Sequence, residues 1–145
     1  MKKTWVVAAE SSRARIFMAE SRVKPMQELE GLAHPMSRAK VLDINSDDAG
    51  KTFDRMGQGM HDMEKEVDPK KHEADLFAKE IADKLQKARA ASEFEALVLI
   101  AAPEFLGMLR KHLDPNTLKS VERTVSKNLV REDEEQIRKA ALELE

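Results

Sequence analysis

The chain has 145 residues, of which 36% are charged and 41% are apolar, and its formal net charge is -2. This length is typical of one domain, the apolar share excludes an intrinsically disordered chain, and the charge balance excludes a global basic field that would draw the protein to nucleic acid or an anionic membrane. The sequence has no cysteine, which excludes disulfides, thiolate zinc sites and cysteine nucleophiles and is compatible with a reducing compartment.

The first residues resemble the start of a secretory signal, because Met1-Lys2-Lys3 precedes an apolar run. That run extends only from Thr4 to Ala9 before Glu10 ends it. A signal peptide needs roughly 7–15 apolar residues and a small-residue cleavage site. A membrane span needs about 20 apolar residues, and no stretch approaches that length. We therefore expect a first strand at Thr4–Ala9, no membrane span and a cytoplasmic protein.

Two short runs of β-favouring residues follow one another, Trp5–Ala8 and Arg15–Met18. The segment between them, Glu10–Arg13, is polar and turn-prone, so the pattern predicts a hairpin. A further extended segment is expected at Gln27–Ala33, and another strand at Val41–Ile44.

A long loop is predicted at about residues 45–67. It opens with the turn-rich run Asn45–Gly50, and Gly57 and Gly59 follow. A connection of this length without secondary structure is unusual inside a compact domain and is usually functional or disordered. We therefore predict a single domain over residues 1–145 whose central loop is the candidate binding region.

A long helix is expected to start at Asp68-Pro69, which supply an N-cap and a first-turn proline, and to end near Ala91. Apolar residues recur at helical spacing within it and predict one buried stripe: Ala74, Phe77, Ala78, Ile81, Ala82, Leu85 and Ala88. Three acid–base pairs at i, i+4 are expected to add a few tenths of a kcal/mol each on the exposed face: Asp75/Lys79, Glu80/Lys84 and Asp83/Lys87.

The continuous apolar run Leu97–Ile100 is typical of a strand that is covered on both faces. It ends at Ala101-Ala102-Pro103, and a helix is expected from Glu104 to Leu113. Strands followed by helix, strand and helix predict an α/β fold, a mixed β-sheet flanked by helices.

The last part of the chain is less uniform. Residues 121–130 fit a strand, because Thr124 and Val125 are β-branched, but the same region could also line a helix through Leu118, Val121, Val125 and Leu129. Both interpretations stay open. A closing helix is expected from about residue 132 to residue 144.

Motifs for metal, cofactor or nucleophile chemistry are not found. The four histidines, at positions 34, 61, 72 and 112, lack zinc-binding spacing, and the acidic residues at positions 62, 64, 66 and 68 lack the EF-hand pattern. The sequence has no Walker A motif, no dinucleotide-binding glycine motif and no G-x-S-x-G elbow. We therefore expect no metal and no cofactor, and the absence of these motifs favours a non-enzymatic protein.

One constellation inside the central loop has chemical potential. Gly57-Gln58-Gly59 places a side-chain amide between two residues that tolerate any backbone geometry, so the amide and the backbone can approach an ester or a phosphate closely. Nearby basic residues can form a local patch for phosphates. The candidate catalytic residue is Gln58, and the candidate binding loop comprises Arg38, Gly50, Lys51, Arg55, Gly57 and Gly59.

Three segments resemble the bacterial host-attachment protein family. They are the opening hairpin Val6–Phe17, the run Asp47–Phe53 and, most specifically, Leu97–Arg110, where a strand, an Ala-Pro turn and a Phe-Leu-Gly-x-Leu-Arg helix occur together. The resemblance covers nearly the whole chain. It implies a role in the attachment of bacteria to host cells.

That family is also similar in fold to the middle domain of archaeal and eukaryotic peptide release factors, an RNase H-like domain. Such domains carry a loop ending in Gly-Gly-Gln, which enters the ribosomal peptidyl-transferase centre and promotes hydrolysis of peptidyl-tRNA. A long helix, a buried strand and another helix follow this loop. The resemblance implies that Gln58 occupies the corresponding position.

This chain departs from the release-factor pattern in two ways. Met56 stands in place of the first glycine, and the acidic residues Asp62, Glu64 and Glu66 after the motif would repel rRNA. Domains that recognise stop codons and recruit a GTPase partner are not found in the sequence, so we do not expect a complete release factor.

Three hypotheses follow. The first is a non-enzymatic host-attachment family protein, a cytosolic interaction domain that binds an unidentified protein and affects attachment indirectly. The second is a ribosome-associated factor in which Gln58 orients water at the peptidyl-tRNA ester. The third is a nucleic-acid or nucleotide-binding domain that uses the Ala101–Glu104 turn, where a strand ends and a helix begins. The sequence predicts no particular oligomer.

Overall fold

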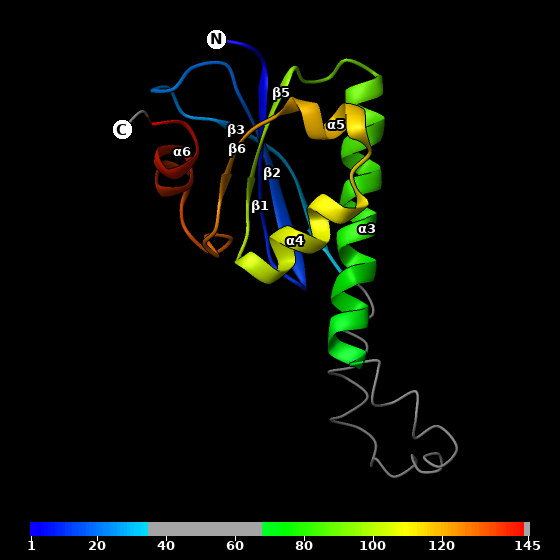
Figure 1. Cartoon of the computed structure of the whole chain (residues 1–145). Helices are drawn as coiled ribbons and strands as arrows, with labels where there is room; N and C mark the ends of the chain where they lie inside the picture. The colour runs from blue at the N-terminus through cyan, green and yellow to red at the C-terminus, as the bar shows by residue number, and fades with distance from the viewer. Residues whose placement is uncertain (35–67, 144–145) are drawn as a thin grey trace, which may run out of the picture.

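The computed structural model describes residues 1–34 and 68–143. Within these residues one five-stranded mixed sheet carries helices on both of its faces (Figure 1). The strand order is β3-β2-β1-β5-β6. The predicted α/β fold, a mixed sheet flanked by helices, is confirmed.

The sheet combines an antiparallel half with a parallel half. β1 (Thr4–Ala9) and β2 (Arg13–Ala19) form the predicted hairpin, and β2 pairs antiparallel with β3 (Gln27–Ala33). On its other side β1 pairs parallel with β5 (Ala96–Ile100), which pairs parallel with β6 (Val121–Val125). The carboxyl ends of β1, β5 and β6 therefore meet at one edge of the sheet.

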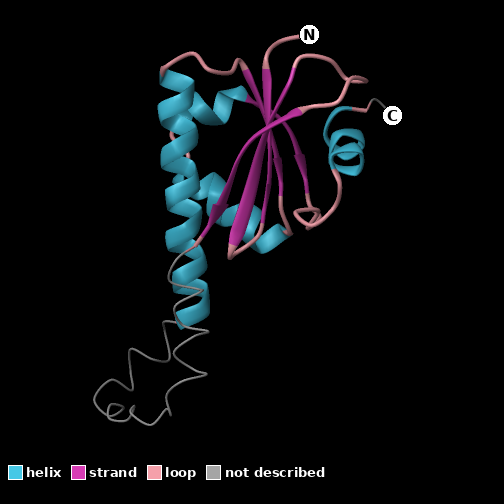
Figure 2. Ribbon diagram, turned by 180° about the vertical axis from the view of Figure 1, so that it is seen from behind, coloured by secondary structure: helices cyan, strands magenta, loops and turns pink. Residues whose placement is uncertain are grey.

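The helices cover the two faces unequally. α3 (Pro69–Ala90) and α4 (Pro103–His112) pack on one face, and the short α5 (Pro115–Ser120) lies beside α3 (Figure 2). α6 (Glu134–Leu142) covers the other face. The strand expected at Val41–Ile44 lies outside the described residues.

β1 explains why the apolar run near the amino terminus is continuous. Trp5, Val7 and Ala9 face the core beneath α3 and α4, whereas Val6 and Ala8 face the core beneath α6. A strand that is buried on both faces needs apolar residues at every position, not at alternate ones.

α3 follows the sequence pattern along its whole length. All seven residues of the expected stripe, from Ala74 to Ala88, are buried. The carboxylate of Asp68 caps the first turn by accepting a hydrogen bond from the amide of Lys70 at 2.9 Å. After the last turn, Ser92 adopts a left-handed φ of 60°, and the amide of Glu93 bonds back to the carbonyl of Ala88.

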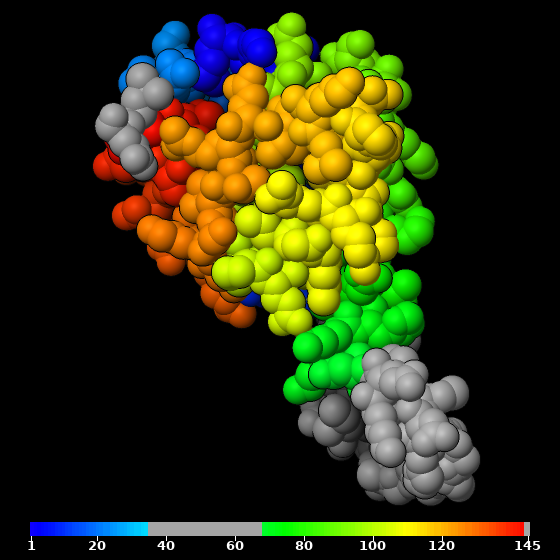
Figure 3. Space-filling model, viewed as in Figure 1, coloured from blue at the N-terminus to red at the C-terminus, as the bar shows by residue number. Residues whose placement is uncertain are grey.

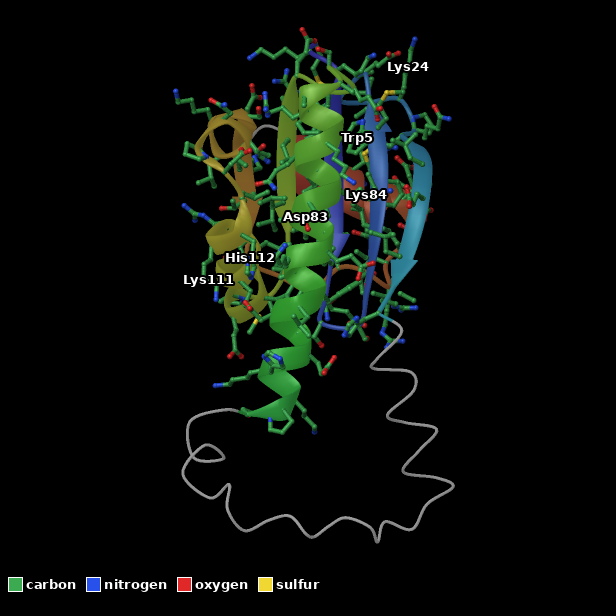
Figure 4. All side chains as sticks on the ribbon, turned by 90° about the vertical axis from the view of Figure 1, so that its right-hand side faces the viewer. Trp5, Lys24, Asp83, Lys84, Lys111 and His112 are labelled. Carbon is green, nitrogen blue, oxygen red and sulfur yellow. The ribbon has the colours of Figure 1, made fainter. Side chains whose placement is uncertain are left out.

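The three expected i, i+4 pairs on α3 are wrong. Asp75 pairs with Lys111 and His112 of α4. Lys84 pairs with Glu30 of β3, and Asp83 pairs with Lys79 (Figure 4). Two of the observed pairs therefore tie α3 to α4 and to β3, and the third joins two turns of α3 in the opposite order to the one expected.

The ambiguous region contains a short helix followed by a strand. The expected break at Asp114-Pro115-Asn116 starts α5, because the Asp114 carboxylate accepts a hydrogen bond from the amide of Thr117 at 2.7 Å. β6 then begins at Val121. The strand interpretation of Thr124 and Val125 is confirmed.

Candidate functional site

The described residues contain an open pocket at the sheet edge where β1 and β5 end. Its volume is about 330 Å³. Crevices beyond the carboxyl ends of parallel strands are the usual binding position in open α/β sheets, and this volume is at the lower end of the range of ligand pockets. Four separate segments line it: Glu10 and Ser11; Lys70, Lys71 and Ala74; Ala102, Glu104, Phe105 and Met108; and Asn128.

The pocket has an apolar floor between α3 and α4. Ala74 and Phe105 are buried in the main core, and Met108 packs against the same core while it stays partly exposed. Phe105 is supported from behind by Phe77, at 6.2 Å between ring centroids. An apolar group that enters the pocket would therefore contact side chains that are already held in place.

The acidic groups around the pocket are engaged with neighbouring side chains. The Glu10 carboxylate accepts hydrogen bonds from Ser12 Oγ at 3.2 Å and from Asn128 Nδ2 at 3.0 Å, and Arg13 Nε lies 3.6 Å away. Glu104 pairs with Lys71 across the rim at 3.4 Å. Both partners of that rim pair are well exposed, so it contributes little stability and is easily separated.

The two helices that begin at the pocket differ at their first residue. α3 has the Asp68 cap, but the N-cap of α4 is Ala102, which makes no side-chain hydrogen bond, and Pro103 follows. α3 also carries Lys70 and Lys71 in its first turn, without an acidic residue there. Basic residues at that end of a helix oppose the helix dipole, so the start of α3 places two positive charges at the pocket, opposite the carboxylates of Glu10 and Glu104.

A buried histidine fixes the start of α3 to the sheet. The Nε2 atom of His34 lies 2.9 Å from Glu73 Oε1, and its ring packs against Phe77 at 5.3 Å between centroids. The backbone amide of His34 donates to the carbonyl of Ser12 at 2.9 Å. These contacts hold the first turns of α3 and the β1–β2 turn together, and both line the pocket.

One carboxylate at the α3–α4 boundary is electrostatically perturbed. Asp75 Oδ1 lies 3.1 Å from Lys111 Nζ and 3.0 Å from His112 Nε2 (Figure 4). Partial burial raises the pKa of Asp75, but the hydrogen bonds and charges of these two partners outweigh burial, and the net pKa is lowered. Asp75 therefore joins the two helices most strongly in its charged form.

The site predicted from the sequence lies outside the described residues. Gln58 and the loop residues Arg38, Gly50, Lys51, Arg55, Gly57 and Gly59 all fall between residues 35 and 67. The described chain stops at His34 and resumes at Asp68, next to the pocket. The Ala101–Glu104 turn of the third hypothesis does lie at the pocket.

The pocket itself was not predicted from the sequence. Glu10, Lys70, Phe105 and Asn128 are far apart in the chain, so their convergence depends on the fold. Two local signals were available: the absence of a capping side chain at Ala102, and a pair of lysines at the start of a helix.

Residues 1–34 and 68–143 hold no group of three or more histidine, aspartate and glutamate side chains arranged for a metal ion. None of the helices in this part of the chain combines the length and the apolar composition that a membrane crossing requires.

Comparison with known families gives one match that covers most of the chain. The family described as "Protein required for attachment to host cells" matches residues 5–140. No curated protein matches the chain.

Proposed function

This chain belongs to the family of proteins required for attachment to host cells, and we propose that it acts as a non-enzymatic interaction domain with an indirect, cytoplasmic role in attachment. A partner binds at the pocket end of the domain, where α3 and α4 begin. The observation that carries this proposal is the pocket of about 330 Å³, with an apolar floor and with Lys70 and Lys71 at the start of α3.

The acidic groups around the pocket support binding more than catalysis. Glu10 is held by Ser12 and Asn128, Glu73 faces His34, and Glu104 faces Lys71. A general acid or base needs access to the substrate proton, whereas these carboxylates already serve contacts inside the protein. A surface with an apolar centre and a polar rim is typical of protein interfaces.

The test is complementation of a deletion strain, with attachment to host cells as the readout. A variant with both Lys70→Glu and Lys71→Glu reverses the charge at the start of α3. It should fold, because acidic residues at a helix start interact favourably with the dipole. We expect it to restore attachment at least tenfold less well than the unchanged gene. Lys87→Glu, at the other end of α3, is the matched control and should restore attachment fully.

Full restoration by the double variant would overturn the proposed binding end. The location is tested separately, by fractionation and by protease treatment of whole cells. We expect the protein in the cytoplasmic fraction and protected from protease. Recovery on the cell surface would contradict an indirect role.

A second candidate function is a ribosome-associated factor that promotes peptidyl-tRNA hydrolysis through Gln58. What supports it is the element order β3, α3, β5, α4, because a long helix, a buried strand and another helix are also what the release-factor resemblance implies after the loop. Sedimentation of cell lysate with ribosomes at low salt, reduced at moderate salt, is the expected result. Migration as a small free protein at both salt concentrations would contradict it.

The catalytic part of this second candidate has its own test. Gln58→Ala should abolish peptidyl-tRNA hydrolysis and leave ribosome binding unchanged, because the side chain would orient water without holding the complex together. Equal hydrolysis by both proteins would remove Gln58 from the proposal.

A further inference from the structure

Gly107 lies in the interior of α4 and is exposed. Glycine is less favourable than every ordinary residue except proline inside a helix. A Cβ atom added at Gly107 would have nothing within 4 Å among the described residues, and no glycine in this part of the chain has a positive φ. Neither space nor backbone conformation therefore requires glycine here, and the described part of the chain offers no compensation for it.

Gly107 is the low point of one continuous face of α4. The residues Glu104, Gly107, Met108 and Lys111 are spaced i, i+3, i+4 and i+7, so they share this face. We call it the α4 face. The α4 segment as a whole lies on the side of the molecule shown in the space-filling view (Figure 3).

Ion pairs to α3 lie at both ends of the α4 face. Glu104 pairs with Lys71 at 3.4 Å, and Lys111 pairs with Asp75 at 3.1 Å. Between these two pairs the face consists of Gly107, which exposes only backbone, and of Met108, whose thioether lines the pocket. Methionine is flexible and adapts to the shape of a binding partner.

A glycine on a helix surface lets a second helix approach closely. Packed helix axes lie about 8–10 Å apart, and the distance depends on the side chains at the contact. A residue without a side chain at the crossing point permits the shorter distances. A local feature that weakens a helix without a benefit inside its own chain is expected at sites that serve function.

Charge indicates the kind of helix that fits. Lys70 and Arg110 flank the α4 face, and neither makes an ion pair within the described residues. Acidic side chains of a partner would complement them. The exposed Glu104 carboxylate and the apolar Met108 do not suit a phosphate backbone, so a protein fits this face better than a nucleic acid.

We propose that the α4 face docks a helix of a partner protein, with small or apolar residues opposite Gly107 and Met108 and acidic residues toward Lys70 and Arg110. This inference rests on the proposed function as an interaction domain and names the kind of partner for the same end of the molecule. Lengthening the side chain at position 107 should therefore block docking without harming the fold.

The experiment is light-induced crosslinking in the bacterium. The photoreactive residue p-benzoylphenylalanine replaces Glu104. This position is chosen because the loss of a negative charge should not weaken the binding of an acidic partner. The same residue at Glu135, on α6 at the opposite face of the sheet, is the control position. Gly107→Gln is then combined with the probe at position 104. Ala90→Gln adds an equal side chain to an exposed position of α3 and is the matched control variant.

We expect one discrete protein adduct from position 104 and none from position 135. Gly107→Gln should reduce the adduct at least tenfold, whereas Ala90→Gln should leave it unchanged. The thermal unfolding midpoint of Gly107→Gln should equal or exceed that of the unchanged protein, because glutamine favours helix and the position is open.

Any of four results would overturn the proposal: no adduct, an adduct that persists in Gly107→Gln, an adduct of two copies of this chain, or an adduct removed by nuclease. The proposed function fails separately. If the adduct depends on Gly107 but attachment is normal in Gly107→Gln cells, the docking face stands and the role in attachment fails. If one of these four results is obtained but attachment still depends on Lys70 and Lys71, only the docking face fails.

Discussion

α3 and α4 pack on the same face of the sheet, yet they follow the rules of helix formation to very different degrees. α3 has a side-chain cap at Asp68 and an uninterrupted buried stripe. α4 starts at Ala102 without such a cap and carries Gly107 in its interior. The charges at the helix ends give the opposite contrast: the first turn of α3 carries Lys70 and Lys71 against the helix dipole, whereas α4 has Glu104 in its first turn and basic residues in its last. Departures without compensation inside the chain, such as Gly107, are expected at surfaces that serve function. In the account proposed above, α3 mainly holds the fold and α4 presents the docking face.

The largest effect is expected where α3 supports the fold. Phe77 is fully buried on α3, between His34 and Phe105. Phe77→Ala should lower the free energy of unfolding by about 3–5 kcal/mol, because it removes a buried ring and leaves a cavity. Urea unfolding measures the loss. Leu76→Ala, at the adjacent and exposed position of the same helix, should change stability by about 0.5 kcal/mol or less. Similar losses from the two variants would contradict the buried stripe.

The next effect concerns the link between the two helices. Asp75→Asn removes the charge that Lys111 and His112 share, and we expect a loss of about 1 kcal/mol, since the site is partly exposed. The lowered pKa of Asp75 fixes the sign of the pH dependence. The stabilisation is fully present above the unfolded-state pKa of about 4 and is lost as pH falls through the lower folded-state pKa.

Urea unfolding of both proteins between pH 7 and pH 2 checks this prediction. The difference in stability between the unchanged protein and Asp75→Asn should be largest near neutral pH and should shrink below about pH 4. A difference that stays constant down to the lowest pH would show that the Asp75 charge does not join the helices.

These two helices also show how far the sequence could predict the molecule. The start of α3 and its stripe were predicted, because Asp68-Pro69 and the spacing of Ala74 to Ala88 are local signals. Its ion pairs were not, since Asp75 and Lys84 reach α4 and β3, which only the tertiary fold brings near. β6 stayed ambiguous for the same reason, as pairing with β5 decides its conformation.

The pocket where we propose that a partner binds was harder to predict from the sequence. Its floor depends on Phe105 and Met108 meeting Ala74 of another helix, and its rim on Glu10 and Asn128 from distant turns. The sequence did identify the Ala101–Glu104 turn, because a buried strand that ends in Ala-Ala-Pro predicts a helix start. Gln58 and its loop lie outside the described residues, and their role stays a prediction.

A smaller effect sharpens the contrast at the two helix starts. Asp68→Ala should cost about 1 kcal/mol of stability, because the amide of Lys70 loses its acceptor. Ala102→Ser should do the opposite at α4 and gain about 0.5–1 kcal/mol, since the extended backbone of Ala102 suits a capping side chain. Thermal or urea unfolding of both variants measures the pair. If Ala102→Ser also lowered the free energy of unfolding, a capping side chain would not stabilise the start of α4, and the contrast between the two helix starts would be wrong.

The most direct test of the central claim measures stability and attachment on the same Gly107→Ala variant. Alanine is the best helix former, so the free energy of unfolding should rise by about 0.5–1 kcal/mol. Its methyl group projects into space that a docked helix would occupy, so attachment in the complemented deletion strain should fall several-fold. A more stable protein that attaches less well is the predicted result. A variant that is more stable and attaches normally would contradict the account, because Gly107 would then serve no partner.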